Sequence, residues 1–172
     1  MATVQKISNA NIYIDGTGSL LGRASGITLP EFMAVTEDAT ALGLMGKFRT
    51  AVGIDILQGT LKWDGYYPEV IALGADPFTA RKLQIYSSVK VIGPDGLEQR
   101  KQRIISMTAT FEGTPLGDYG PQANVGFEQP FSATRLRDEL DGEELLEFDV
   151  FNLVWRVRGV DLLAEYRKNL GL

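Results

Sequence analysis

The sequence predicts a mainly β fold: a β-barrel or sandwich with a long hairpin extension and one or two short flanking α-helices. Apolar and polar residues alternate at Leu83, Ile85, Val89 and Val91, a period of two that is typical of a half-buried strand. Other short apolar runs end at glycine, proline or aspartate, which mark turns between strands. Asp141-Gly142 is the strongest of these signals, because Asp-Gly suits the tight turn of a β-hairpin.

Three short strands are predicted in the N-terminal part of the chain. Residues 11–14 form an apolar run that ends at the turn pair Asp15-Gly16. Residues 20–29 form the next strand, and Pro30 marks its end or a sheet edge, because proline cannot donate a backbone hydrogen bond to a neighbouring strand. Residues 60–63 give a further strand signal.

The segment 30–56 is predicted to form an extended hairpin. Residues 32–38 and 47–56 alternate loosely between apolar and polar, and the link between them is rich in glycine, alanine and methionine. A two-stranded arm is only marginally stable alone in water, so we expect neighbouring copies of the chain to cover this one. The apolar residues expected at that contact are Phe32, Val35, Leu42, Leu44, Met45, Phe48, Val52 and Ile54.

Two more hairpins are predicted in the second half of the chain. The first joins strands at 82–92 and 98–111 across a Gly-Pro-Asp-Gly turn. The second joins strands at 127–140 and 144–157 across the Asp-Gly turn named above. Residues 113–126 are rich in glycine and proline, and they are expected to form the loop between the two hairpins.

Two short helices are predicted beside these strands. Residues 66–74 form the first, with Pro68 in its first turn and Gly74 at its C-cap. Asp161 is expected to cap the second, which is C-terminal and amphipathic. Its apolar face consists of Leu162, Leu163, Tyr166 and Leu170.

Composition excludes most enzyme classes. At 172 residues the chain is expected to form a single domain spanning 1–172. Cysteine and histidine are both absent, which excludes disulfides, thiolate nucleophiles, zinc sites of the usual kind and histidine-dependent acid–base catalysis. No apolar run approaches the ~18 residues of a membrane span, and the N-terminus lacks the layout of a secretory signal. We therefore expect a protein that folds in a cytoplasm and needs no cofactor.

Acidic residues outnumber basic ones, 22 to 17, for a formal net charge of −5. The densest acidic run is 138–149, which holds seven acids and no base. Strand alternation places Glu143, Glu147 and Asp149 on one face of a hairpin arm. Together with Glu144 they remain formal candidates for a paired-carboxylate site or a Ca²⁺ cluster. The favoured interpretation is a solvated or channel-lining acidic face.

Nucleotide and nucleic-acid binding are not indicated. Residues 16–22 approach a dinucleotide fingerprint, but the third glycine is one residue late and no helical run follows. Gly46-Lys47 lacks the following Ser or Thr of a phosphate loop, because Phe48 stands there. The densest basic cluster, Arg100, Lys101 and Arg103, is interpreted as a solvated strand face or an intersubunit ion-pair patch.

Several motifs follow one another along the chain in a characteristic order and spacing. They are Asn11-Ile12-Tyr13-Ile14-Asp15-Gly16, Thr28-Leu29-Pro30, Thr36-Glu37-Asp38 with Gly43 and Met45-Gly46, Gly53-Ile54-Asp55, Asp141-Gly142-Glu143-Glu144-Leu145-Leu146-Glu147-Phe148-Asp149 with Asn152, Arg158-Gly159-Val160-Asp161 and Arg167-Lys168-Asn169-Leu170-Gly171-Leu172. In these motifs the chain resembles the major tail tube proteins of contractile-tailed phages (myoviruses) and of R-type bacteriocins. The resemblance covers essentially the whole length.

This resemblance implies a structural subunit of a virion, made in the bacterial host cytoplasm, and not an enzyme. Subunits of this family form hexameric rings that stack into a hollow tube inside a contractile sheath, and the tube conducts DNA into the host. The segment 30–56 would then be the hairpin that reaches an adjacent ring. The chain departs from many relatives at 39–42, where they carry a more basic or glycine-rich tip.

The resemblance also implies partners and a channel. The expected partners are other copies of the chain, the sheath protein, the baseplate hub, the tape-measure protein and the tail terminator. DNA would pass transiently without stable binding, and the chain would not insert into a membrane. A net-acidic chain suits such passage, because it repels phosphates. The candidate acids of a channel or an interface are Glu37, Asp38, Asp141, Glu143 and Glu147.

Two alternatives remain open at the level of sequence. The first is the tube subunit of a DNA-free contractile bacteriocin or injection system, whose subunit architecture is the same. The second is a soluble β-barrel binding module for carbohydrate, with Trp63, Tyr66 and Tyr67 as a stacking platform. Burial of these aromatic side chains in a core or an interface is the competing interpretation of that platform.

Overall fold

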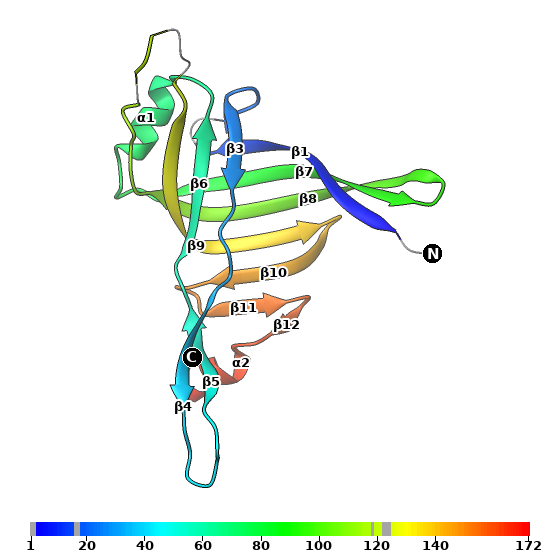
Figure 1. Ribbon diagram of the computed structural model, residues 1–172, viewed down its shortest axis with the longest axis vertical. Coiled ribbons are helices and arrows are strands. Elements are labelled where there is room, and N and C mark those ends of the chain that lie inside the picture. Colours follow the sequence, from blue (N-terminus) through cyan, green and yellow to red (C-terminus); the bar gives the residue numbers. More distant parts are fainter. Residues whose placement is uncertain (1–2, 16–17, 118, 122–124) are drawn as a thin grey trace.

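Figure 1 shows two sets of strands that cross at a steep angle in the computed structural model, which describes residues 3–15, 18–117, 119–121 and 125–172. The two helices, α1 (Pro68–Gly74) and α2 (Ala164–Asn169), lie at the margins. The strands are β1 (Val4–Ile14), β2 (Gly18–Ser19), β3 (Ala24–Thr28), β4 (Ala34–Ala39), β5 (Phe48–Ile54), β6 (Leu57–Trp63), β7 (Arg81–Gly93), β8 (Gly96–Phe111), β9 (Phe127–Leu140), β10 (Glu143–Asp149), β11 (Val154–Val157) and β12 (Val160–Asp161).

The main sheet follows the antiparallel order β12-β11-β10-β9-β8-β7-β1-β2, and β9 joins the two sets of strands. One edge of β9 pairs with β8. The opposite edge is shared, because β6 pairs with residues 127–133 and β10 pairs with residues 135–140. β3 pairs with the outer edge of β6. The sheet therefore folds over at β9 and encloses a core between its two parts.

The core lies between β6 and the central strands of the sheet. Burial alternates strictly along β6, whose Leu57, Leu61 and Trp63 point inward. Full burial of an apolar side chain of this size stabilises a fold by about 1.5–3 kcal/mol. The inward positions predicted on β7 are all buried, namely Leu83, Ile85, Val89 and Val91. The large antiparallel sheet and the two short helices confirm the predicted mainly β class.

The extended hairpin is also confirmed. β4 and β5 form a two-stranded sheet of their own, which pairs from Ala34↔Ile54 to Ala39↔Phe48 with one shift of register between Val35 and Thr36. In Figure 1 this hairpin runs away from the main sheet, past α2, and its tip is the lowest part of the molecule. The hairpin between β7 and β8 is the second long projection, and it extends to the right in the same view.

Three predicted strand boundaries in the N-terminal half are wrong. The strand predicted at 11–14 begins at Val4, and β1 pairs with β7 over this whole length. The strand predicted at 60–63 begins earlier, at Leu57. It includes Gly59, where the Phe131 ring packs directly on the backbone. The strand predicted at 20–29 is shorter, since β3 starts at Ala24. A turn over residues 21–23 precedes it, and Leu20 before that turn is buried in the core.

The single strand predicted at 144–157 is in fact two strands. β10 ends at Asp149 and β11 begins at Val154. The break is an Asx-type turn, in which the Asp149 carboxylate accepts hydrogen bonds from Asn152 N (2.9 Å) and Asn152 Nδ2 (2.7 Å). Leu153 completes the turn with a φ of 50°. β11 then pairs antiparallel with β10.

The two helices differ from the prediction at their ends. α1 has Pro68 in its first turn as expected, but its C-cap is Ala75 and not Gly74. Gly74 is buried, and a Cβ there would lie 2.6 Å from Gln129 Nε2. Packing therefore explains this glycine. α2 starts after Leu163, and Asp161 belongs to β12. No helix in the described residues is long and apolar enough to cross a membrane.

Candidate assembly surfaces

The outer part of the β4–β5 hairpin carries exposed apolar side chains. Leu42 and Met45 at the tip are fully exposed, and Leu44, Phe48 and Val52 are about half exposed. Val35 belongs to the same group, with 43% of its surface exposed. A two-stranded sheet with free edges and such side chains is unlike the protected edges that soluble monomers present.

The base of the same hairpin packs against the subunit's own core. Phe32 and Ile54 are half-buried there, and the Phe32 ring meets the Phe148 ring edge-on at 5.7 Å between centroids. The backbone continues this attachment, because Asp55 N donates a hydrogen bond to Met33 O (2.8 Å). The eight predicted contact residues thus divide into an anchored base and an exposed arm. Met33, 60% exposed, belongs with the exposed arm and was not among them.

Four of the five candidate acids are exposed, namely Glu37, Asp38, Asp141 and Glu143. Asp38 accepts a hydrogen bond from Arg49 Nε across the hairpin (3.1 Å). Glu147 is different, with only 4% of its surface exposed. The isolated subunit therefore does not present Glu147 as a solvated acid.

The predicted alternation of acids along β10 is wrong because of a β-bulge. The register between β10 and β9 shifts between Glu144 and Leu146, so one extra residue lies in β10. Glu144 consequently lies on the same side of the sheet as Glu147 and Asp149, whereas Glu143 points to the other side.

The side of β7–β11 that faces away from the core is mainly polar, and we refer to its part over residues 82–86, 104–108, 135–139, 144–149 and 154–156 as the polar face. Cross-strand register places Glu147 opposite Arg137 on β9 and opposite Arg156 on β11. On the neighbouring strand β8, Ser106 lies opposite Arg137 of β9 and opposite Gln84 of β7. Its polar residues are Lys82, Gln84, Ser106, Thr108, Arg135, Arg137, Glu139, Glu144, Glu147, Asp149 and Arg156, and the half-buried Tyr86, Ile104 and Val154 lie among them.

Each of the three arginines on the polar face pairs with two carboxylates, and we call this network the arginine ladder. The pairs are Arg135 with Glu147 (2.7 Å) and Asp149 (3.7 Å), Arg137 with Glu139 (2.7 Å) and Glu144 (3.4 Å), and Arg156 with Glu144 (3.2 Å) and Glu147. Among the described residues, Lys82 has no carboxylate within ion-pair distance and is the one cation of the polar face without such a partner.

The ladder keeps Glu147 ionised. Burial raises the pKa of this carboxyl, but hydrogen bonds from Arg135 and Arg156 outweigh that effect and hold the pKa below its ordinary value of 4.5. A buried carboxylate with two guanidinium partners is a stable arrangement only while both partners remain in place. The network thus fixes the relative positions of β9, β10 and β11.

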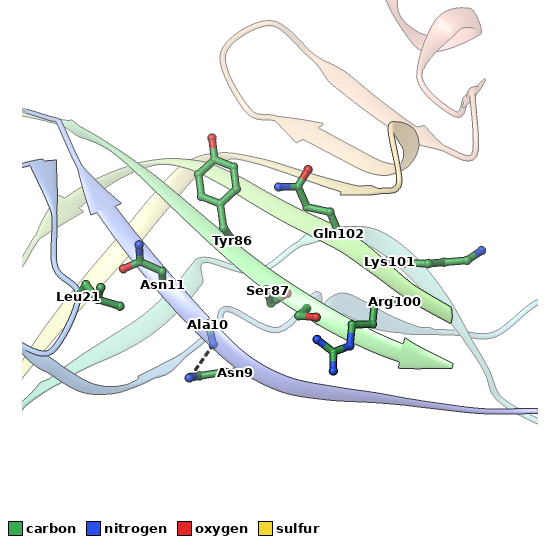
Figure 2. A pocket seen from close by; sticks show the side chains of 10 residues that line it. Asn9, Ala10, Asn11, Leu21, Tyr86, Ser87, Arg100, Lys101 and Gln102 are labelled. Carbon is green, nitrogen blue, oxygen red and sulfur yellow. Dashed lines mark hydrogen bonds between the residues drawn. The ribbon is translucent and has the colours of Figure 1, made fainter. Parts of the chain in front are cut away.

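The basic cluster divides in two. Arg103 forms a bidentate pair with Asp138, from Nε to Oδ1 (2.9 Å) and from Nη2 to Oδ2 (2.7 Å). Arg100 and Lys101 line a groove of about 500 Å³ between β1, β7 and β8, which also holds Tyr86. Figure 2 shows Arg100 extending toward the β1 side of this groove and Lys101 extending in the opposite direction. Of the three residues of the basic cluster, only Arg103 therefore forms an ion pair within the described subunit.

The aromatic residues do not form a stacking platform. Trp63 is 1% exposed, and its indole N–H donates to Gln129 Oε1 (2.9 Å) inside the core. Tyr67 is half-buried against Trp63, and Tyr66 alone of the three is well exposed. Because Trp63 is buried, it cannot stack on a sugar at the surface, and the stacking platform of the carbohydrate-binding alternative is not formed.

The C-terminal element is held by charge rather than by burial. Arg167 pairs with Asp161, and its Nη1 also donates to Leu153 O (2.6 Å). The hydrogen bond from Arg167 holds the pKa of Asp161 below its ordinary value. α2 buries none of its residues, and Leu170 and Leu172 remain 54% and 77% exposed. The apolar C-terminal run therefore does not dock on the core of its own chain.

A family model and a known protein both match this chain over almost its full length. The family model for phage tail tube protein FII matches residues 4–171. The tail tube protein of Escherichia phage P2 is 27% identical over 182 aligned positions, and the alignment covers 100% of both chains.

Two solved structures share the fold. A chain of the sheath–tube complex of an extracellular contractile injection system, PVC, in the extended state matches with a TM-score of 0.54 and 13% identity, covering 76% of this chain and 88% of that one. A chain of the PVC sheath/tube terminator in the extended state matches with a TM-score of 0.53 and 11% identity, covering 78% and 95%. At these identities the comparison establishes the fold alone.

Proposed function

Because the chain belongs to the phage tail tube protein FII family, we propose that its subunits form hexameric rings that stack into a hollow tube inside a contractile sheath. A member of this family is a structural component of the virion and not an enzyme. The tube conducts DNA from the particle into the host, and no step of this function needs a catalytic residue.

The exposed arm of the β4–β5 hairpin carries this proposal. Its apolar side chains, above all Leu42, Leu44 and Met45, lie beyond the reach of the subunit's own core. Contact with a neighbouring ring would bury them and would stabilise the tube by about 25 cal/mol for each Å² of apolar surface removed from water. Because the hairpin tip and the surface that receives it are different parts of the chain, the contact does not close on itself, and repetition produces a filament.

The base of the hairpin supports the same assignment. Phe32 packs on Phe148, and the backbone bond from Asp55 to Met33 fixes the arm to the main sheet. An arm fixed at its base and exposed along its length is suited to transmit force between rings. We place the exposed acids Glu37, Asp38, Asp141 and Glu143 at interfaces or at the channel rim, where they add to the net charge of −5.

The partners of the tube follow from its place in a tail. The solved structures with this fold belong to sheath–tube and sheath/tube-terminator assemblies. By analogy, a sheath protein surrounds this tube and a terminator protein ends it. We further propose that a baseplate hub meets its other end and that a tape-measure protein occupies the channel before DNA does.

Replacement of Leu44 and Met45 by aspartate tests the hairpin's role. We expect the double variant to fold as a subunit, since both residues are exposed, and to lose tube formation. Thr40→Asp, which adds a charge to an exposed polar position of the same hairpin, is the matched control and should still form tubes. Unchanged tube yield in the double variant would refute the role given to the hairpin.

A second candidate is the tube of a DNA-free contractile injection system, favoured by the fold shared with the PVC assemblies. The two functions differ in cargo and not in subunit architecture. Extraction of nucleic acid from nuclease-treated parent particles separates them. Protected genomic DNA supports the phage tail, and its consistent absence supports the injection system.

A further inference from the structure

The polar face differs from every other large surface of the subunit. Exposed large apolar side chains lie on the β4–β5 hairpin, on α2, on β1, in the loops, and at Leu97 of β8, Val157 of β11 and Val160 of β12. Tyr13 of β1, 39% exposed, lies opposite Gln84 and borders the polar face. Over residues 82–86, 104–108, 135–139 and 144–149, which make up most of the polar face, no large apolar side chain is exposed. A surface of this kind suits permanent contact with water, whereas the apolar surfaces suit contact with other copies of the chain.

The polar face is also hollowed. A depression of about 350 Å³ lies over β7, β8 and β9, and its lining includes Lys82, Gln84, Ser106 and Thr108. Hydroxyl and amide groups dominate this part of the surface. The depression continues toward the arginine ladder, since Arg135 and Arg137 line its far side.

Charge on the polar face is balanced and not acidic. Within these bounds it holds four cations, Lys82 and the three ladder arginines, and four carboxylates, so its formal charges cancel. Toward the end of the β7–β8 hairpin the same side of the sheet continues with Lys90 opposite Arg100, neither of which has an ion pair among the described residues. The chain as a whole carries −5. The acidic excess therefore lies on other parts of the subunit, and repulsion by a net-acidic lining does not describe this face.

Free guanidinium groups are the side chains that hold phosphate most firmly, because they can donate two parallel hydrogen bonds to it. In the ladder these donors face carboxylates on the same surface. Glu147 receives Arg135 Nη2 at 2.7 Å and also pairs with Arg156. Glu144 lies between Arg137 and Arg156 at 3.4 Å and 3.2 Å. The atoms nearest Glu144, Arg137 Nε and Arg156 Nε, are buried and make no hydrogen bond among the described residues, so Glu144 holds these two groups by charge. All three arginines are thus paired with carboxylates before a phosphate reaches them.

We propose that the polar face lines the channel of the tube, and that the arginine ladder masks its three arginines from the polyanion that passes. This inference rests on the proposed tube. It assigns the inner surface to the outward sides of β7–β11 and gives the carboxylates of β10 a specific role, which is to occupy guanidinium groups and not to repel phosphates. The bulge in β10 contributes to this masking, because it brings Glu144 onto the polar face beside Glu147.

The position of the face is tested with a single cysteine, which is possible because the chain has none. Gln84→Cys places a thiol in the exposed hollow of the polar face. In assembled tubes we expect a small thiol reagent to label it, while a maleimide on a polyethylene glycol chain too large for the channel labels it at least tenfold more slowly. In disassembled subunits both reagents should react.

Two results would overturn this position. Equal labelling of tubes and subunits by the large reagent places the face on the outside of the tube. Protection from both reagents in tubes places it in a subunit interface. If the wild-type protein forms no tubes, it is the proposed function that fails, and this outcome is separate from either of the two.

Masking is tested with charge-matched variants in assembled tubes. Glu144→Gln releases Arg137 and Arg156 from one carboxylate, and Glu112→Gln makes the same charge change at an exposed position outside the polar face. We expect tubes of the first variant to retain about tenfold more of a short fluorescent DNA duplex than wild-type tubes, with retention falling steeply as salt rises. Tubes of the second variant should behave as wild type.

Two further variants support this test: one reverses the effect of Glu144→Gln, and one replaces it if it does not assemble. Adding Arg156→Gln to Glu144→Gln removes a released guanidinium and should return retention toward the wild-type level. If Glu144→Gln does not assemble, Glu139→Gln releases Arg137 from its other partner and allows the same comparison. Equal retention by the ladder variant and the Glu112→Gln control contradicts masking.

Discussion

The indole N–H of Trp63 donates a 2.9 Å hydrogen bond to Oε1 of Gln129, and both side chains are 1% exposed. Gln129 Nε2 in turn donates to the backbone carbonyl of Val70 in α1 (3.0 Å). One buried amide thus connects β6, β9 and α1. We expect Gln129→Ala to leave a buried donor and a buried acceptor unpaired and to lower the free energy of unfolding by about 2–4 kcal/mol.

Chemical denaturation followed by tryptophan fluorescence measures this effect on unassembled subunits. Gln58→Ala, an exposed glutamine on the neighbouring strand β6, is the control and should change stability by no more than about 0.5 kcal/mol. Similar losses in the two variants would show that the buried amide is not a structural connection.

Gly59 on β6 tolerates no side chain. A Cβ there would lie 2.7 Å from Thr28 O and 2.8 Å from Phe131 Cε2, so the neighbouring strand would have to move. We expect Gly59→Ala to cost about 3 kcal/mol of stability, at the upper end for overpacking. Gly26 on the paired strand β3 has open space around its Cβ position, so Gly26→Ala should keep the wild-type melting temperature or raise it slightly.

Stability should fall in acid partly because of Glu147. Its pKa is held below the ordinary value of 4.5 in the folded subunit, so the unfolded chain takes up this proton at a higher pH than the folded chain. The contribution is complete above the unfolded pKa and is lost as pH falls through the folded one. Glu147→Gln should therefore be less stable at neutral pH and should show a flatter pH dependence of unfolding below pH 4.5.

Urea unfolding at a series of pH values provides the measurement. Glu143→Gln is the matched control, because Glu143 is exposed and has no ion pair within the described subunit. It should follow the wild-type pH dependence. A Glu147→Gln curve parallel to the wild-type curve would contradict the role of the ladder in acid stability.

The two halves of the hairpin should respond differently to truncation. Phe32→Ala removes the edge-on contact with Phe148 and should lower subunit stability by about 1–2 kcal/mol, less than for a fully buried phenylalanine. Val35→Ala changes an exposed residue and should leave the subunit's melting temperature unchanged while slowing tube assembly. Equal effects on the melting temperature would contradict the division into an anchored base and an exposed arm.

Much of the fold could be predicted from the sequence wherever alternation and turn chemistry agree. The β7 positions Leu83, Ile85, Val89 and Val91 are buried as expected, and β9 has the predicted bounds 127–140. Asp141 and Gly142 form the expected tight turn, with φ of 55° and 85°. These features are determined by residues close together in the chain, so they can be predicted from a single sequence.

The misses arose where tertiary contacts override local signals. The predicted strand began at residue 60, yet β6 starts at Leu57, because pairing with β9 extends it. Gly59 lies within the strand, where the ring of Phe131 occupies the space that a side chain would need. The acids of β10 were assigned to faces by strict alternation, and one bulge moved Glu144 to the face of Glu147. The arginine ladder was not predicted, because its arginines come from β9 and β11, and cross-strand register is not visible in the sequence.

Electron microscopy of the purified protein over a range of concentrations tests the central claim most directly. The exposed hairpin and the membership in the tail tube family predict stacked rings with a central channel, which lengthen into tubes as concentration rises. A monodisperse monomer at every concentration would contradict the claim.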